Sequence, residues 1–178
     1  MIGRSTAARI GGRVAARDGE SLPLKFTASV PGELRFRDLV GSMVRAVCLR
    51  VERDAGCAGL EWRLMSAYNE AFNNIVEHAY AVAPGDVEVV LLVDDESVVL
   101  RMIDQGAGFD FQEAGASDQA PELDSLSEGG MGLFIIRNAM SSVTYERRQD
   151  KNLLTMTKTL AECAAPPADA SSHRDSRC

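Results

Sequence analysis

The sequence is short of positive charge and of long apolar runs. It holds 19 Lys and Arg against 26 Asp and Glu, which gives a formal net charge of −7. General affinity for nucleic acid or for an anionic membrane surface needs a surplus of basic residues, so we expect neither ligand. No run of about 18 apolar residues is present, so no segment is expected to span a membrane. These absences favour a cytoplasmic protein.

Cysteine is also sparse, and two familiar motifs are missing. None of the four cysteines belongs to a C-x-x-C pair, which argues against a zinc site or a thioredoxin-type motif. We interpret the cysteines as reduced thiols of a cytosolic protein rather than as a disulfide framework. The phosphate-binding patterns G-x-x-x-x-G-K-S/T and G-x-G-x-x-G are absent as well, so a nucleotide site in this chain must use another fold.

The residues that are present indicate one domain between two disordered ends. Residues 1–22 are rich in Ala, Gly and Arg and lack the apolar core of a secretory signal, which predicts a disordered leader. Residues 161–178 are rich in Ala, Pro and Ser and predict a disordered tail. Residues 23–160 are long enough to form one domain with its own hydrophobic core.

Hydrophobic periodicity predicts both helices and strands within that domain. Helical spacing of apolar residues occurs in three segments, at 33–53, 59–80 and 131–142. Strand patterns occur in five segments, at 24–30, 87–93, 98–104, 143–148 and 152–160. This predicts an α+β fold, a two-layer α/β sandwich whose mixed, mostly antiparallel sheet carries about three helices on one face. A long polar stretch, residues 105–128, has no periodicity and is expected to be a functional loop.

The second predicted helix carries a polar stripe. Glu70, Asn74 and His78 follow one another at intervals of four, which places them on neighbouring parts of one helix face. A carboxylate can act as a base, and an amide oxygen is a suitable ligand for Mg²⁺. Taken alone, the stripe is explained far better by a solvated helix face. Asn73 and Asn74 are poor helix formers, which counts mildly against that simpler interpretation.

Two glycine-containing motifs follow along the chain. Asp104, Gly106 and Gly108 come directly after a predicted strand, where a carboxylate can accept from an exocyclic amine and glycines can approach a flat ring. The glycines at 129–132 precede an apolar helix, whose free N–H groups can bind phosphate. A turn and a flexible helix start are the plain alternatives. Together with the polar stripe, the motifs would supply metal, base and phosphate recognition in one site.

The three motifs resemble those of the Bergerat-fold ATPases, the group of gyrase, a heat-shock chaperone, sensor histidine kinases and mismatch-repair ATPases. NEAFNNIVEHAY resembles the family's N box, DQGAGFD its first glycine box and GGMGLFIIRNAMSSVTYE its second. The resemblance covers about residues 24–160. Within the group, the chain is most similar to the anti-sigma-factor serine kinases, which are short stand-alone domains.

The resemblance implies roles for the matching residues. Glu70 would be the general base that activates the serine hydroxyl of a protein substrate, and Asn74 would coordinate Mg²⁺. His78 fits the family pattern and is assigned to packing rather than to catalysis. Phosphoryl transfer needs little beyond such positioning and charge stabilisation.

The resemblance also implies how ATP would be bound. Asp104 would contact the adenine amine, with Gly106 and Gly108 against the base. The phosphates would be held at the start of the third helix by Gly130, Met131, Gly132 and Leu133.

The sequence departs from the family pattern at two places. Residues 109–128, where the ATP lid would lie, contain six acidic residues and neither Lys nor Arg. Charge neutralisation would then fall on Mg²⁺ and helix N–H groups, with Arg137 or a partner's arginine as a further source. The closing strand also lacks the family's Gly-Thr pair, and Thr155 and Thr157 are the candidates to replace its adenine contact.

The function implied is an ATP-dependent serine/threonine protein kinase that phosphorylates a small antagonist (anti-anti-sigma) protein and binds a sigma factor. A non-catalytic, nucleotide-dependent binding switch is a second hypothesis, which the acidic lid sequence favours. A detached catalytic domain of a histidine kinase is a third. The resemblance also implies a homodimer, for which the strand at 24–30 and the first helix are the expected surface.

Overall fold

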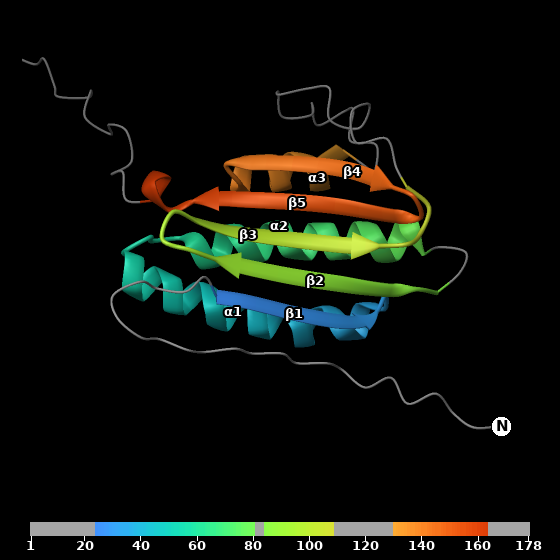
Figure 1. The fold of residues 1–178 in the computed structure, drawn as a ribbon, viewed down its shortest axis with the longest axis horizontal. Coiled ribbons are helices and arrows are strands. Elements are labelled where there is room, and N and C mark those ends of the chain that lie inside the picture. Colours follow the sequence, from blue (N-terminus) through green and yellow to red (C-terminus); the bar gives the residue numbers. More distant parts are fainter. Residues whose placement is uncertain (1–23, 81–83, 109–129, 164–178) are drawn as a thin grey trace, which may run out of the picture.

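A computed structural model describes residues 24–80, 84–108 and 130–163 (Figure 1). The predicted leader, the lid sequence at 109–128 and the tail beyond Cys163 lie outside the described residues. The strands are β1 (Leu24–Pro31), β2 (Asp86–Val93), β3 (Ser97–Asp104), β4 (Ser142–Arg148) and β5 (Lys151–Thr159). The helices are α1 (Leu34–Ala55), α2 (Leu60–Asn74), α3 (Gly130–Ala139), the π-helix η1 (Ile75–Ala79) and the 3₁₀ helix η4 (Leu160–Glu162).

The described strands form one sheet in the order β1-β2-β3-β5-β4, and every neighbouring pair is antiparallel. The predicted sheet was mixed and mostly antiparallel, so the observed pairing is more uniform than expected. β2 and β3 form the predicted hairpin. Its acidic turn is closed by Asp94, whose Oδ1 accepts hydrogen bonds from the backbone N–H groups of Glu96 and Ser97.

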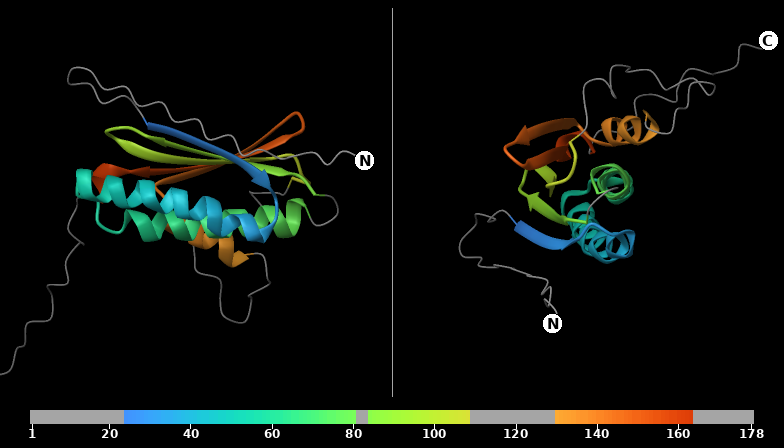
Figure 2. Two further views of the ribbon diagram at one scale, coloured as in Figure 1. Left: turned by 90° about the horizontal axis from the view of Figure 1, so that it is seen from below. Right: turned by 90° about the vertical axis from the view of Figure 1, so that its right-hand side faces the viewer.

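All three α-helices cover the same face of the sheet, which confirms the two-layer sandwich (Figure 2). α1 and α2 lie side by side and contribute fully buried side chains at helical spacing, such as Val40 and Val44 from α1 and Leu64 and Tyr68 from α2. The inward residues of β3 and β5 alternate with half-buried or exposed ones, whereas β2 buries three consecutive residues, Val89, Val90 and Leu91. These strands close the core from the other side. No helix in the described ranges is long and apolar enough to cross a membrane.

The second predicted helix is not one continuous α-helix. The α-helical turns end at Asn74, and residues 75–79 continue as the wider π-helix η1, closed by a bond from the N–H of Tyr80 to the carbonyl of Ile75 at 3.1 Å. Short π-helical segments often occur at functional sites. Here the segment lies beside the end of β3, where the second predicted motif begins.

The interpretation of all cysteines as reduced thiols is wrong for two of them. Cys57, in the loop before α2, forms a disulfide with Cys163 after η4, with Cα atoms 4.7 Å apart. Cys48 is a buried free thiol. The prediction failed because the spacing of Cys57 and Cys163 along the chain says nothing about the fold that brings the helix loop and the end of β5 together.

Candidate functional site

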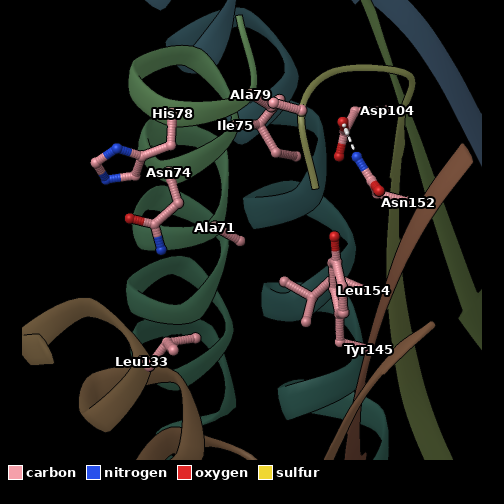
Figure 3. A pocket seen from close by; sticks show the side chains of 11 residues that line it. Ala71, Asn74, Ile75, His78, Ala79, Asp104, Leu133, Tyr145, Asn152 and Leu154 are labelled. Atoms are coloured by element: carbon pink, nitrogen blue, oxygen red, sulfur yellow. Dashed lines mark hydrogen bonds between the residues drawn. The ribbon is translucent and has the colours of Figure 1, made fainter. Parts of the chain in front are cut away.

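A pocket lies between the helix layer and the sheet, at the end where α2 passes into η1 (Figure 3). About 400 Å³ of space lies between its walls, and this figure includes open solvent. Helices and strands both contribute to its wall, which consists of Ala71, Asn74, Ile75, His78, Ala79, Asp104, Ala107, Leu133, Tyr145, Asn152 and Leu154. The predicted residues Asn74 and Asp104 therefore line one pocket.

One end of the pocket is formed by two buried polar side chains on neighbouring strands. Asp104 ends β3 and is 5% exposed, and Asn152 at the start of β5 is 2% exposed. Oδ1 of Asp104 accepts from Nδ2 of Asn152 at 2.7 Å and from the backbone N–H of Gly106 at 2.9 Å. Nδ2 of Asn152 also donates to the carbonyl of Gly106 at 3.2 Å. These bonds fix the orientation of the aspartate (Figure 3).

The first predicted glycine pair is required by close approach. A Cβ at Gly106 would overlap the backbone carbonyl of Ala79 in η1, and the N–H of Ala107 donates to that carbonyl oxygen at 3.1 Å. A Cβ at Gly108 would meet the guanidinium of Arg147. It would also lie 3.1 Å from both Oδ1 of Asn152 and the hydroxyl of Tyr145. The segment after β3 is thus packed between η1 and the strands.

Tyr80 anchors the same segment from the other side. Its hydroxyl donates to the carbonyl of Asp86 at 2.7 Å and accepts from the backbone N–H of Gln105 at 3.1 Å. Burial raises the pKa of this phenol. The phenol therefore stays protonated at neutral pH and holds the end of η1 against the start of β2 and the end of β3.

At the far end, the first and third motifs meet. A Cβ at Gly132 would lie 3.0 Å from Oε2 of Glu70 and 3.4 Å from Nδ2 of Asn74, so α3 begins directly against this polar pair. The first backbone N–H groups of a helix have no partner within the helix and attract negative charge. Glu70 and Asn74 therefore lie beside a helix start that can bind phosphate.

The other residues of that predicted turn divide between core and surface. Leu133 is buried and its side chain belongs to the pocket wall, whereas the side chain of Met131 is exposed. Gly130 is the first residue of α3. His78 is exposed and lies on the pocket wall. Arg137, predicted as a further cation, is in the last turn of α3 and does not line the pocket.

The proposed threonine contacts are not in the pocket. Thr155 and Thr157 alternate along β5 with the buried Leu154 and Met156, so the threonines belong to the opposite face of the sheet. The residue of β5 that meets Asp104 is Asn152, which is paired directly with it in the sheet register. Sequence reasoning missed Asn152, because its position opposite Asp104 is set by the register of β3 and β5 and not by a local motif.

The charge of the site is uneven. The wall residues from the described ranges include one carboxylate, Asp104, and neither Lys nor Arg. Arg147 is the basic side chain that the structure adds, since it pairs with Asn152 across β4 and β5 and its guanidinium lies over Gly108. Phosphate bound at the start of α3 would therefore be stabilised mainly by helix N–H groups, because Arg147 lies at the other end of the site, beside Gly108.

Comparison with known proteins connects this geometry to a family. The model of the histidine kinase-like ATPase domain matches residues 38–158. Serine/threonine-protein kinase BtrW of Bordetella bronchiseptica is 36% identical over 106 residues, which are 59% of this chain and 75% of that protein. Serine-protein kinase RsbW of Bacillus cereus is 30% identical over 96 residues, 52% of this chain and 59% of that protein, and RsbW of Bacillus thuringiensis gives the same values.

The chain thus spans three quarters of the first relative's length and less than two thirds of the other two. The family match covers more than half of the 178 residues and contains every site residue discussed above. The chain therefore belongs to the family of histidine kinase-like ATPase domains.

Proposed function

We propose that this chain is an ATP-dependent serine/threonine protein kinase of the anti-sigma-factor type, acting in the cytoplasm. It would phosphorylate a small antagonist protein and bind a sigma factor. The observation that carries the proposal is the contact of Gly132 with Glu70, which puts a carboxylate beside the helix start where phosphates would bind. The kinase names of the BtrW and RsbW relatives support the same activity.

ATP would lie with its base at Asp104 and its phosphates at α3. Within the described residues, both hydrogen bonds to Asp104 go to Oδ1, which leaves Oδ2 to accept from the exocyclic amine of adenine. Ala71, Ile75 and Leu154 give the base apolar walls. The backbone amides at the start of α3, from Gly130 to Leu133, would hold the phosphates.

The side chains beside the start of α3 also suit Mg²⁺, because this ion prefers oxygen ligands. Asn74 offers an amide oxygen next to Gly132, and Mg²⁺ is commonly held by one or two protein oxygens together with substrate phosphates and waters. No cluster of three His, Cys, Asp or Glu that could hold an ion by itself exists in the described ranges. Asn74 would thus be the protein ligand, and the bound ion would offset phosphate charge.

Glu70 would act as the general base. Its carboxylate would accept the proton of the substrate hydroxyl as that oxygen bonds to the γ-phosphorus of ATP and the bond to the ADP oxygen breaks. Glu70 is half-buried on α2. A bulky side chain at Gly132 would compete for its space, which explains the need for glycine there.

The test is transfer of label from radiolabelled ATP to small antagonist-like proteins whose genes neighbour the gene of this chain. We expect an acid-stable phosphoserine or phosphothreonine, and Glu70→Gln should lower transfer by about 100-fold or more while ATP binding stays within a few-fold. Glu77→Gln, an exposed carboxylate on η1, is the matched control and should be active. Acid-labile phosphohistidine would instead indicate a detached histidine kinase domain. Transfer unaffected by Glu70→Gln would refute the assigned base.

The binding switch is the second candidate, because residues 109–128 carry acidic side chains and no basic one. Calorimetry separates the two: nucleotide-dependent partner binding without phosphoryl transfer would favour the switch. We also propose a homodimer, because β1 is an edge strand of the sheet and α1 exposes Leu34, Leu39 and Leu49. Light scattering that gives the monomer mass at micromolar concentration would reject the dimer.

A further inference from the structure

We propose that Asn152 is the specificity-determining partner of Asp104, and that the two side chains together select a 6-amino purine over a 6-oxo purine. The inference rests on the proposed function in one respect, that the ligand of the pocket is a purine nucleotide. It adds a residue that lies outside the three sequence motifs.

The first observation is a buried acceptor without a donor. Oδ1 of Asn152 is the buried side-chain oxygen or nitrogen that has no hydrogen-bond partner within the described part of the chain. Leaving such a group unsatisfied is costly, so a folded protein retains one where a ligand or an ordered water supplies the missing partner. Asn152 lines the pocket, so the ligand can supply that partner.

The second observation is that the amide cannot turn around. Nδ2 lies 2.7 Å from a carboxylate oxygen of Asp104 and 3.2 Å from the carbonyl of Gly106, and both are acceptors. A flipped amide would put Oδ1 against these two oxygens and lose both bonds. Asp104 and Gly106 therefore fix Nδ2 toward themselves, and Oδ1 is held on the other side, near the empty side-chain position of Gly108.

The pair thus presents acceptors only. Oδ1 of Asp104 is occupied by Asn152 and Gly106, so Oδ2 remains as one acceptor and Oδ1 of Asn152 is the other. The exocyclic amine of adenine has two N–H donors and can satisfy both, directly or through one water. Guanine has a carbonyl oxygen at the same ring position, which would face two acceptors. Unpaired polar groups of this kind give strong discrimination between ligands.

The test measures binding of ATP, GTP and purine riboside triphosphate, which carries hydrogen in place of the 6-amino group. The variant is Asn152→Leu, which keeps the branched shape and the number of side-chain heavy atoms and removes the amide. The matched control is Thr155→Val on the opposite face of the same strand. Circular dichroism and thermal unfolding show whether each variant is folded.

We expect wild type and Thr155→Val to bind ATP at least about 10-fold more tightly than the other two nucleotides. Asn152→Leu should weaken the binding of ATP by about 10-fold. It should change the binding of purine riboside triphosphate by less than about 2-fold, because this nucleotide has no 6-amino group to contact residue 152. A merely structural role predicts equal weakening of both nucleotides. Equal weakening, or an unchanged ATP to GTP ratio, would overturn the proposal.

Three other results would also be decisive. If Asn152→Leu does not fold, Asn152→Val decides: its side chain can neither donate to Asp104 nor accept from the base, so undiminished ATP selectivity would overturn the proposal. If wild type binds ATP selectively but transfers no phosphate, the kinase proposal fails and the role of Asn152 stands. If wild type binds no purine nucleotide, both fail.

Discussion

Gly132 packs directly on Glu70, so that a Cβ at residue 132 would lie 3.0 Å from the carboxylate oxygen Oε2. The contact joins the start of α3 to the polar stripe of α2. It leaves no room for a side chain unless the carboxylate moves. Because Glu70 is half-buried and its carboxylate ends a flexible side chain, that movement is possible, and function should suffer before stability does.

Gly132→Ala is therefore expected to separate activity from stability. Alanine in place of glycine in a helix stabilises it by about 0.5–1 kcal/mol, which roughly offsets the cost of displacing one side-chain end. The melting temperature should change little, whereas phosphoryl transfer should fall by about 10-fold or more because the base is displaced. Calorimetric unfolding and the labelled-ATP assay measure the two quantities.

Asn138→Ala is the matched control for that variant. Asn138 is an exposed residue of α3 whose side chain bonds only to the carbonyl of Phe134 in the described ranges. The Asn138→Ala variant should have a higher helix propensity in α3, should leave Glu70 in place and should keep full activity. A Gly132→Ala protein that is fully active would show that Glu70 need not occupy its observed position.

Gly106→Ala should act in the opposite way and damage the fold itself. Its Cβ would overlap the backbone carbonyl of Ala79, and a backbone group cannot swing aside as a side chain can. Relief would break the bond from the N–H of Ala107 to that carbonyl, so we expect a loss of about 1–3 kcal/mol of stability. Urea unfolding measures the loss.

Gly108→Ala provides the comparison, since its Cβ would meet side-chain atoms of Arg147, Tyr145 and Asn152 instead of backbone. Arg147 is exposed at the end of β4 and can move away. We expect this variant to lose less stability than Gly106→Ala. A larger loss of stability in Gly108→Ala than in Gly106→Ala would mean that the backbone contact between η1 and the end of β3 adjusts more easily than the distances indicate.

Much of the fold could be predicted because hydrophobic periodicity along the chain indicates its helices and strands. The motifs that contain Glu70, Asn74 and Asp104 could be recognised because their spacing is fixed. Asn152 could not be assigned with the same means. Its proposed role depends on the register that sets it opposite Asp104, and a shift of one residue would have turned Thr155 inward instead. Register and the Cys57–Cys163 contact are properties of the assembled sheet and helices, which local sequence patterns do not encode.

Reduction of the Cys57–Cys163 disulfide should destabilise the domain without unfolding it. The bond joins the loop before α2 to the segment after η4 across a sequence separation of 106, and such cross-links contribute about 2–4 kcal/mol, largely by restricting the unfolded chain. Urea unfolding with and without dithiothreitol measures the difference. The double variant Cys57→Ser/Cys163→Ser should have the same free energy of unfolding as the reduced protein, and dithiothreitol should not change it.

Alkylation followed by mass spectrometry checks the same bond directly. Of the four cysteines the disulfide takes two, so the unfolded, unreduced protein should accept two alkyl groups and the reduced protein four. Four groups without reductant would contradict the bond. Because disulfides are rare in a reducing cytoplasm, the number found in freshly lysed cells also tests the proposed location.

Cys48 should make the domain less stable in alkali. Burial, with smaller contributions from the carboxylates of Glu52 and Glu61, raises the pKa of this thiol from an ordinary 9.0 to about 12. Above pH 9 the thiol ionises in the unfolded chain and stays protonated in the fold. The stabilisation is therefore complete below pH 9 and is lost as the pH rises toward 12, by up to about 1.4 kcal/mol for each pH unit.

The measurement is the free energy of unfolding between pH 8 and 10, made in the Cys57→Ser/Cys163→Ser background so that no thiol–disulfide exchange interferes. Adding Cys48→Ala should lower stability at pH 8, because it leaves a small cavity, and flatten the decline above pH 9. The range stops at pH 10 because burial also raises the pKa of Tyr68, which would add a loss of the same sign at higher pH. An equal decline with and without Cys48 would place the alkaline sensitivity on another group.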